Sequence, residues 1–235
     1  MALPKLNDNP SYRVTVPSTG QETSFRPFLV KEQKALLIAY ETQDKKDMIR
    51  AVLKTIEACI EEPLRGNLTT FDVDYLFTKI RAKSVGETAD IQVKCSKCES
   101  VNEVSVELDN VTMSGEVSEN VISLNDDVSV EMRYPTYEQF MDSQTLLEDG
   151  SPTETLMDLL IVCMQSVLTE EERIDMSTES HASINEFLES MTAEQFERVT
   201  EFVSNMPTVT QEIAFKCVSC KHKNVRTLKG MDDFF

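Results

Sequence analysis

Two Cys-x-x-Cys pairs constrain the fold of this chain more than any other feature of its sequence. The first pair is Cys95 and Cys98, the second is Cys217 and Cys220, and 118 residues lie between Cys98 and Cys217. Each pair follows an alternating apolar stretch and a lysine. Two intervening residues let both sulfurs of a pair point at one tetrahedral centre, and four thiolates complete the coordination of Zn²⁺. We therefore predict one structural zinc site, held by all four cysteines.

Because the two pairs are far apart in the sequence, the predicted site links two distant segments of the chain. It joins the segment 207–235 to the first part of the chain, 1–110, and leaves 111–206 between them as a mainly helical insertion. The entropy cost of closing a loop grows only slowly with its length, whereas zinc binding to small cysteine sites contributes on the order of 10–16 kcal/mol. We therefore expect these three segments as the domain organisation, with the last one completing the zinc site.

Other kinds of cysteine chemistry fit this sequence less well. A thioredoxin-like oxidoreductase has one Cys-x-x-Cys pair at a helix N-terminus, whereas both pairs here lie in strand-turn-strand patterns. Structural disulfides are rare in cytosolic proteins. Catalytic zinc keeps an open position with His or Glu ligands, and two separate zinc sites would need four further ligands, with only His222 nearby. A metal-free remnant of a zinc site is the other alternative.

The apolar pattern predicts an α+β fold that is dominated by helices. Two alternating segments flank the turn Pro17–Gly20 and predict an N-terminal β-hairpin. Three helical segments follow, and Asp44 is a suitable N-cap for the second. Around the first Cys turn, apolar residues then recur at every second position, which is typical of β-strands. The expected elements are strands 11–16 and 23–30, helices 31–41, 45–61 and 71–82, and strands 89–93 and 101–108.

Helical patterns return after Pro135, between one further strand and the second Cys turn. The expected elements are strand 128–133, helix 136–147, a very apolar helix from a capping box at Ser151 to about Leu168, an acidic loop over 169–180, short helices starting with capping boxes at Ser183 and Thr192, and strand 209–215. We expect Cys59 and Cys163, which fall inside helical patterns, to be buried apolar residues. The two Cys turns, each between strands, meet at one zinc-ribbon-like site.

The charge and composition exclude several classes of protein. The chain has 235 residues and a formal net charge of -18, which disfavours nucleic acid and anionic membranes as partners. The longest apolar run, 156–167, is too short and too polar to span a membrane, and residues 1–12 contain no signal peptide. No Gly-rich phosphate loop is present, and no nucleophile, base and oxyanion set can be assembled. We therefore expect a non-enzymatic cytosolic protein.

Basic residues gather around the two Cys turns despite the acidic composition. They are Lys94, Lys97, Lys216, Lys221, Lys223, Arg226 and Lys229. One interpretation is a zinc-ribbon surface that binds nucleic acid. The interpretation we favour is local compensation of a doubly negative zinc-tetrathiolate centre.

Two pairs of aromatic residues are candidates for contacts with a partner protein. Phe25 and Phe28 flank Arg26 and Pro27 in the second strand of the N-terminal hairpin, and proline is typical of sheet edges. Phe234 and Phe235 follow two aspartates. For both pairs the alternative is a place in the protein's own core.

Several sequence strings resemble the baseplate hub proteins of T4-like tailed phages, including those of marine cyanophages. They are Met1–Lys5, Phe25–Lys34 with Leu36–Leu37, and Arg81–Glu87 just before the first Cys turn. The resemblance extends over about the first hundred residues and, more loosely, the second Cys turn. Residues 111–206 are similar only in their helical character.

This resemblance implies a role in building the baseplate hub, as a component or as an assembly factor. Its partners are then other baseplate hub proteins, and its location is the host cytoplasm during assembly or the tail baseplate of the virion. The family implies no catalytic residue. A zinc-ribbon regulatory protein that binds nucleic acid is the main alternative, and a thiol oxidoreductase is the next.

Overall fold

The computed structural model describes residues 9–115, 117–142 and 151–234 and divides the chain into two compact units. Unit 1 consists of residues 1–67, 71–114 and 208–235, and unit 2 consists of residues 68–70 and 115–207. Apart from residues 68–70, the chain leaves unit 1 after Ser114, forms unit 2, and returns to unit 1 at Thr208.

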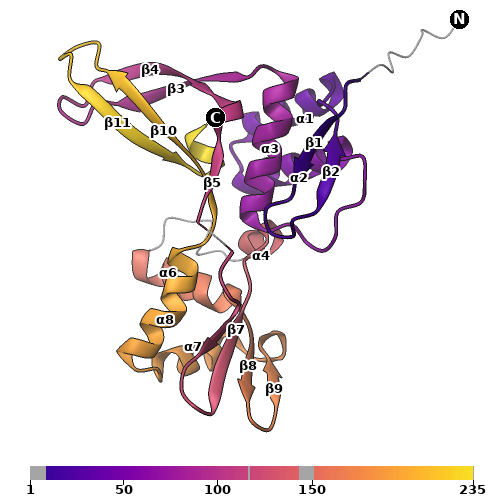
Figure 1. The fold of residues 1–235 in the computed structure, drawn as a ribbon, viewed down its shortest axis with the longest axis vertical. Helices are drawn as coiled ribbons and strands as arrows, with labels where there is room; N and C mark the ends of the chain where they lie inside the picture. The colour runs from indigo at the N-terminus through magenta and orange to yellow at the C-terminus, as the bar shows by residue number, and fades with distance from the viewer. Residues whose placement is uncertain (1–8, 116, 143–150, 235) are drawn as a thin grey trace, which may run out of the picture. The chain divides into compact units, whose positions relative to one another are not determined.

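Unit 1 begins with a β-hairpin and three helices, in the order that the sequence predicts (Figure 1). The bounds are β1 (Tyr12–Thr15), β2 (Glu22–Phe25), α1 (Val30–Thr42), α2 (Lys45–Cys59) and α3 (Thr70–Ser84). The side chain of Asp44 accepts hydrogen bonds from the backbone N–H groups of Lys46 and Asp47, so the predicted N-cap of α2 is confirmed. The side chains of Phe71, Leu76 and Ile80 anchor α3, since each is at most 2% exposed.

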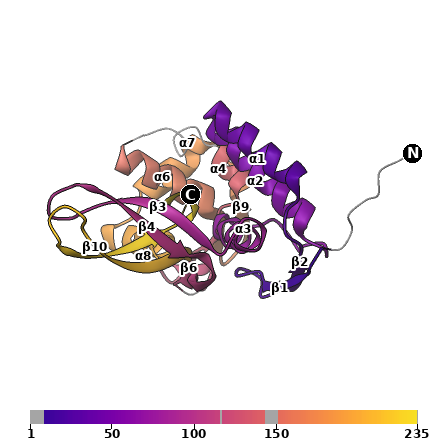
Figure 2. The same ribbon diagram turned by 90° about the horizontal axis from the view of Figure 1, so that it is seen from above.

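Two β-hairpins follow the same plan and carry the two Cys turns. The first consists of β3 (Thr88–Lys94) and β4 (Val101–Glu107), and the second of β10 (Thr208–Lys216) and β11 (Lys223–Lys229). The strand β5 (Thr112–Ser114) extends the second hairpin into a sheet of order β11-β10-β5. Both hairpins lie side by side in two views (Figures 1 and 2). The predicted strand-turn-strand pattern around each cysteine pair is confirmed.

Buried side chains from both hairpins form one apolar cluster with the end of α3. Ile91 and Val106 contribute from the first hairpin, and Ile213 and Leu228 from the second. Phe234 joins this cluster and is fully buried. The alternation of buried and exposed residues in β3 follows from the period-two pattern of its sequence.

Unit 2 packs helices on a four-stranded antiparallel sheet of order β6-β7-β8-β9. Its elements are β6 (Val121–Ser123), β7 (Val128–Met132), α4 (Tyr137–Asp142), α6 (Pro152–Cys163), β8 (Met164–Thr169), β9 (Arg173–Asp175), α7 (His181–Glu189) and α8 (Ala193–Ser204). Val130, Leu160 and Val199 are 0% exposed and belong to one core cluster of this unit. The capping boxes at Ser151 and Thr192 are present.

Three expectations for this region need correction. The apolar helix from Ser151 ends at Cys163, because Met164–Thr169 forms β8, one of the two inner strands of the sheet. A short apolar run fits a buried strand as well as a buried helix, so its periodicity does not decide between them. Part of the acidic loop forms β9, and α7 is capped by Ser180 rather than Ser183.

The fold is therefore a mixture of helices and small antiparallel sheets, and a helix-dominated description is too strong. The segment 111–206, expected to be mainly helical, contains the four-stranded sheet. Residues 143–147 of the expected helix 136–147 lie outside the described part of the chain. Within the part that the structure describes, no helix combines the length and the apolar character that crossing a membrane requires.

Candidate metal centre

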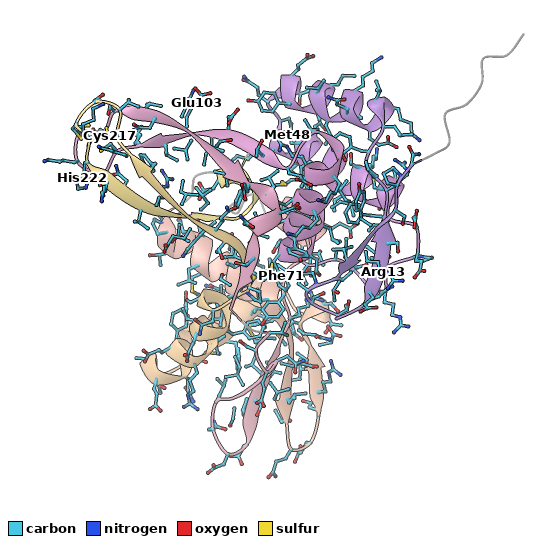
Figure 3. All side chains as sticks on the ribbon, turned by 45° about the horizontal axis from the view of Figure 1, so that its top comes forward. Arg13, Met48, Phe71, Glu103, Cys217 and His222 are labelled. Carbon is cyan, nitrogen blue, oxygen red and sulfur yellow. The ribbon has the colours of Figure 1, made fainter. Side chains whose placement is uncertain are left out.

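The four cysteine sulfurs meet where the tips of the two hairpins come together (Figure 3). The Sγ atoms of all four cysteines lie within 4.8 Å of one another. The Sγ atoms of Cys95 and Cys220 are 3.7 Å apart, and those of Cys98 and Cys217 are 3.6 Å apart. Each of these short distances joins one hairpin to the other. The sequence prediction that the two pairs share one place in the fold is confirmed.

The sulfur spacing fits a tetrahedral zinc ion. With Zn–S bonds of about 2.3 Å, the edge of a regular tetrahedron of four sulfurs is about 3.8 Å. The 3.6 and 3.7 Å distances agree with this edge. A disulfide requires about 2.05 Å between sulfurs, and all six cysteines, Cys59 and Cys163 included, are free thiols. The residues present therefore match a four-cysteine zinc site better than a pair of disulfides.

Each turn is closed by the same two backbone hydrogen bonds. In the first, the N–H of Cys95 donates to the carbonyl of Ser100 at 3.0 Å, and the N–H of Glu99 donates to the carbonyl of Cys95 at 3.0 Å. In the second, the equivalent bonds are Cys217 to His222 at 2.9 Å and Lys221 to Cys217 at 3.1 Å. The two turns are thus near copies of one another.

The residue after the second cysteine has a left-handed backbone in both turns. Glu99 has φ of 58° and Lys221 has φ of 60°. This conformation is uncommon outside glycine and is kept where the surrounding structure demands it. Here it turns the chain sharply enough for both cysteines of a pair to face the same centre.

A pair of buried asparagines joins the two turns crosswise. The Oδ1 atom of Asn224 accepts a hydrogen bond from the backbone N–H of Ser96 at 2.9 Å, and the Oδ1 atom of Asn102 accepts one from the N–H of Val218 at 2.8 Å. Each asparagine also donates through Nδ2 to a carbonyl of its own turn, at 2.8 Å for Asn102 and 3.1 Å for Asn224. Both side chains are less than 10% exposed. The pair therefore holds the two turns together independently of any metal.

These asparagines were not predicted from the sequence, although a signal for them was present. Both turns have the pattern Cys-x-x-Cys-x-x-x-Asn, which places Asn102 and Asn224 four residues after the second cysteine of each pair. The strand registers are equivalent as well, because Asn102 pairs with Val93 and Asn224 pairs with Phe215. Comparison of the two turns beyond their cysteines would have revealed both residues.

Hydrogen-bond donors around the sulfurs favour thiolates. The hydroxyl of Ser100 lies 3.2 Å from the Sγ of Cys217 and, with the backbone N–H groups of Cys220 and Ser219, lowers the pKa of Cys217 to about 5. Burial opposes ionisation of Cys95, but the backbone N–H groups of Lys97 and Cys98 outweigh it and hold its pKa below the ordinary value. These donors prepare the site for a cation that binds thiolates.

Repulsion between the sulfurs limits how many of them ionise without a cation. The backbone N–H of His222 favours the thiolate of Cys220, but the neighbouring sulfurs and burial outweigh it and raise the pKa of Cys220 to about 11. Four thiolates at this spacing need a cation between them. A divalent ion such as Zn²⁺ supplies that charge.

The two cysteines outside the cluster are buried, as expected. Cys59 and Cys163 are each 1% exposed. Burial raises the pKa of Cys59 to about 11 and that of Cys163 to about 12. Both thiols therefore remain protonated at neutral pH and act as small apolar core residues.

The aromatic candidates for partner contacts lie inside unit 1. Phe25 is 3% exposed, Phe28 is 9% exposed and Phe234 is fully buried. These three rings therefore lie in the protein's own core, which was the alternative to a contact with a partner. Phe235 lies outside the described residues. A contact of these aromatic residues with a partner protein stays a prediction.

Comparison with known proteins places the chain in a family. A family model described as T4 bacteriophage base plate protein matches residues 9–235, which is nearly the whole chain. The chain therefore belongs to the family of T4 bacteriophage base plate proteins. No curated protein and no solved structure matches it. The resemblance to baseplate proteins of T4-like phages is thus confirmed.

Proposed function

We propose that this chain is a non-enzymatic structural protein of the phage tail baseplate, acting at the hub as a component or as an assembly factor. It binds other baseplate hub proteins and carries one structural zinc ion on Cys95, Cys98, Cys217 and Cys220. The family match over residues 9–235 supports the baseplate role. The host cytoplasm is the expected place of assembly, and the virion baseplate is the expected destination.

The four-sulfur cluster is the observation that carries the structural part of this proposal. A fully cysteine-coordinated zinc ion has no open position for a substrate, so such a site contributes stability rather than catalysis. The cluster joins two hairpins that lie on either side of unit 2 in the sequence. A zinc ion there fixes the two ends of unit 1 to each other.

Metal analysis and co-purification test the two halves of the proposal. We expect one zinc ion per chain after purification without added metal, and loss of that zinc in the Cys95→Ser and Cys217→Ser variants. We also expect the chain to bind at least one purified baseplate hub protein of the same phage. Absence of zinc would overturn the metal site, and a chain that binds none of these proteins would overturn the baseplate role.

A nucleic-acid-binding zinc ribbon is the second candidate function. The hairpin of β10 and β11 favours it, because residues 208–229 contain five Lys or Arg and one Glu. Several phosphate contacts give binding that weakens steeply with salt. Binding to DNA or RNA with such a salt dependence would support this function over the baseplate role, and its absence would remove it.

A further inference from the structure

The helical hairpin of α1 and α2 carries exposed apolar side chains that no other described element of unit 1 covers. Six of the exposed large apolar residues of the described chain fall within residues 29–48: Leu29, Val30, Leu37, Ile38, Tyr40 and Met48. The two helices run side by side (Figure 2), and Met48 lies near the start of the second (Figure 3). Of these six, only Ile38 lines the groove between the two helices, and the other five lie outside it. Exposed apolar side chains on a helical hairpin are typical of a site for protein contacts.

A groove of about 480 Å³ runs between these two helices. On α1 it is lined by residues at positions 31, 35, 38, 39 and 42, and on α2 by residues at positions 47, 50, 51, 54 and 55, with Glu32 completing the lining. Both sets recur at helical spacing, so each forms a stripe along its helix. The floor includes Ala35, Ala39 and Ala51, whose small side chains leave the space open. The groove therefore has the length and direction that suit a third helix.

The charge of this helical hairpin differs from that of the whole chain. Residues 30–59 contain six Lys or Arg and five Asp or Glu, whereas the chain has a net charge of -18. Lys31 lines the groove on α1 and Lys54 lines it on α2. Within the described residues, no ion pair involves Lys54. A basic residue thus flanks the apolar floor on each side.

The acidic residues of the groove are already bound within the protein. Glu32 accepts a hydrogen bond from Arg26 at 3.0 Å and another from the N–H of Leu29 at 2.8 Å, and it also pairs with Lys31 at 3.3 Å. Asp47 pairs with Arg50 at 3.4 Å. Glu32 thus serves two cations, Arg26 and Lys31, and Asp47 is paired with Arg50, so neither carboxylate neutralises Lys54. The groove therefore suits an occupant that carries its own carboxylates.

We infer that the groove between α1 and α2 binds an amphipathic helix of a partner baseplate protein, with acidic residues flanking its apolar stripe. The apolar side chains of the bound helix lie on the alanine floor and against Ile38. The acidic side chains that flank them pair with Lys31 and Lys54. This arrangement follows the common mode in which a helix fills a hydrophobic groove. The inference rests on the proposed function, because it takes the partner from among the baseplate proteins.

Two substitutions in the groove and one outside it test this inference. Ile38 is 52% exposed, so Ile38→Glu places a charge on the groove without disturbing the core. Lys54→Glu reverses the charge of one rim. Val85 is 58% exposed and does not line the groove, so Val85→Glu is the matched control. All three variants should keep the thermal unfolding midpoint and the zinc content of the natural sequence.

The probes are the other baseplate proteins of the same phage, purified one at a time and titrated by calorimetry. For the protein that binds, we expect Ile38→Glu to weaken binding at least about tenfold and Lys54→Glu about three- to tenfold, while Val85→Glu stays within about twofold. Hydrogen exchange of the complex should protect α1 and α2, and in the partner a helix with acidic flanks.

The outcomes separate this inference from the proposed function. If no baseplate protein binds the natural sequence, the proposed function fails and this inference fails with it. If one binds equally well to Ile38→Glu and Val85→Glu, only the groove assignment is overturned. A chain that sediments as a dimer, and as a monomer after Ile38→Glu, would show that a second copy fills the groove and would also overturn the partner helix.

Discussion

The two units differ in charge and in the way they are held together. Residues 115–207 contain 21 Asp or Glu, three Arg and no Lys, so unit 2 carries a charge of -18. The remaining residues contain 20 acidic and 20 basic side chains and are neutral. Unit 2 has one contiguous apolar core, whereas the two hairpins of unit 1 meet at a cysteine cluster.

The two units are therefore stabilised in different ways. The hairpins of unit 1 come from distant parts of the chain, and two-stranded sheets are only marginally stable alone. A shared apolar cluster, a pair of crossed asparagines and the cysteine cluster, at which we propose a zinc ion, hold them together. Apart from residues 68–70, unit 2 is formed by one stretch of chain, 115–207, and it tolerates a high charge because its core supplies the stability. The predictions below test whether the two units respond separately.

Removal of the metal should have the largest effect and should be confined to unit 1. Zinc binding to cysteine sites contributes on the order of 10–16 kcal/mol, so chelation or Cys217→Ser should abolish amide protection in β3, β4, β10 and β11. Unit 2 should keep its protection. Hydrogen exchange measured by NMR checks both statements.

Cys163→Ala is the control for this experiment, because it removes a buried thiol of unit 2 and leaves the metal cluster intact. It should retain one zinc ion per chain. Loss of protection in α6 and α8 on chelation would contradict the separation of the two units.

A cavity in the core of unit 2 should destabilise unit 2 and leave unit 1 unchanged, which is the reverse of the effect expected for metal removal. Leu160 is 0% exposed in the core of unit 2, so Leu160→Ala should destabilise that unit by about 2–5 kcal/mol. The zinc content and the protection of the Cys hairpins should not change. Chemical denaturation followed by residue-specific NMR signals measures the two effects, and a parallel loss in both units would show that they unfold as one.

Loss of one crossed asparagine should have a smaller effect within unit 1. Asn224→Ala leaves the N–H of Ser96 without its buried acceptor, which costs about 1–3 kcal/mol. Zinc should still bind, with lower affinity, as measured by competition with a chromogenic chelator. Asn102→Ala should act alike, because its bond to Val218 is equivalent.

The double variant distinguishes a joint role from two local ones. If the asparagines hold the turns together as a pair, the two costs should differ from simple addition. Additive effects would instead assign each asparagine to its own turn.

Salt should produce the smallest difference. The Debye length falls from about 10 Å at 0.1 M to about 3 Å at 1 M salt, so added NaCl screens the repulsion among the carboxylates of unit 2. We expect a gain of less than about 1 kcal/mol in unit 2 and none in neutral unit 1. Local stabilities from hydrogen exchange at both salt concentrations provide the measurement, with unit 1 as the internal reference.

Much of the fold could be predicted because local signals and tertiary structure agree. Asp44, Ser151 and Thr192 cap helices where the sequence places them. The alternation of β3 predicts a half-buried strand, which the structure contains. The cysteine cluster was also predictable, since two matched turns favour one shared centre over the alternatives.

The features that could not be predicted from the sequence have identifiable physical causes. Met164–Thr169 continues the apolar run of α6, and the sequence alone does not show that its backbone pairs with β7 and β9. Phe25 and Phe234 were ambiguous, because an aromatic residue beside polar neighbours fits a core as well as an interface. The groove between α1 and α2 depends on small residues of two helices, so it emerges only when the helices are placed together.

Because unit 2 is inserted between the two Cys hairpins, the two cysteine pairs are synthesised at different times. Cys98 and Cys217 are 119 positions apart, and ribosomes add about 5–20 residues per second. The first cysteine pair therefore waits roughly 6–24 s for the second, while the whole of unit 2 emerges and can fold. A chain broken off during this interval contains two thiols that cannot complete the metal site. With the zinc ion proposed above, zinc retention would mark chains whose translation has passed both hairpins.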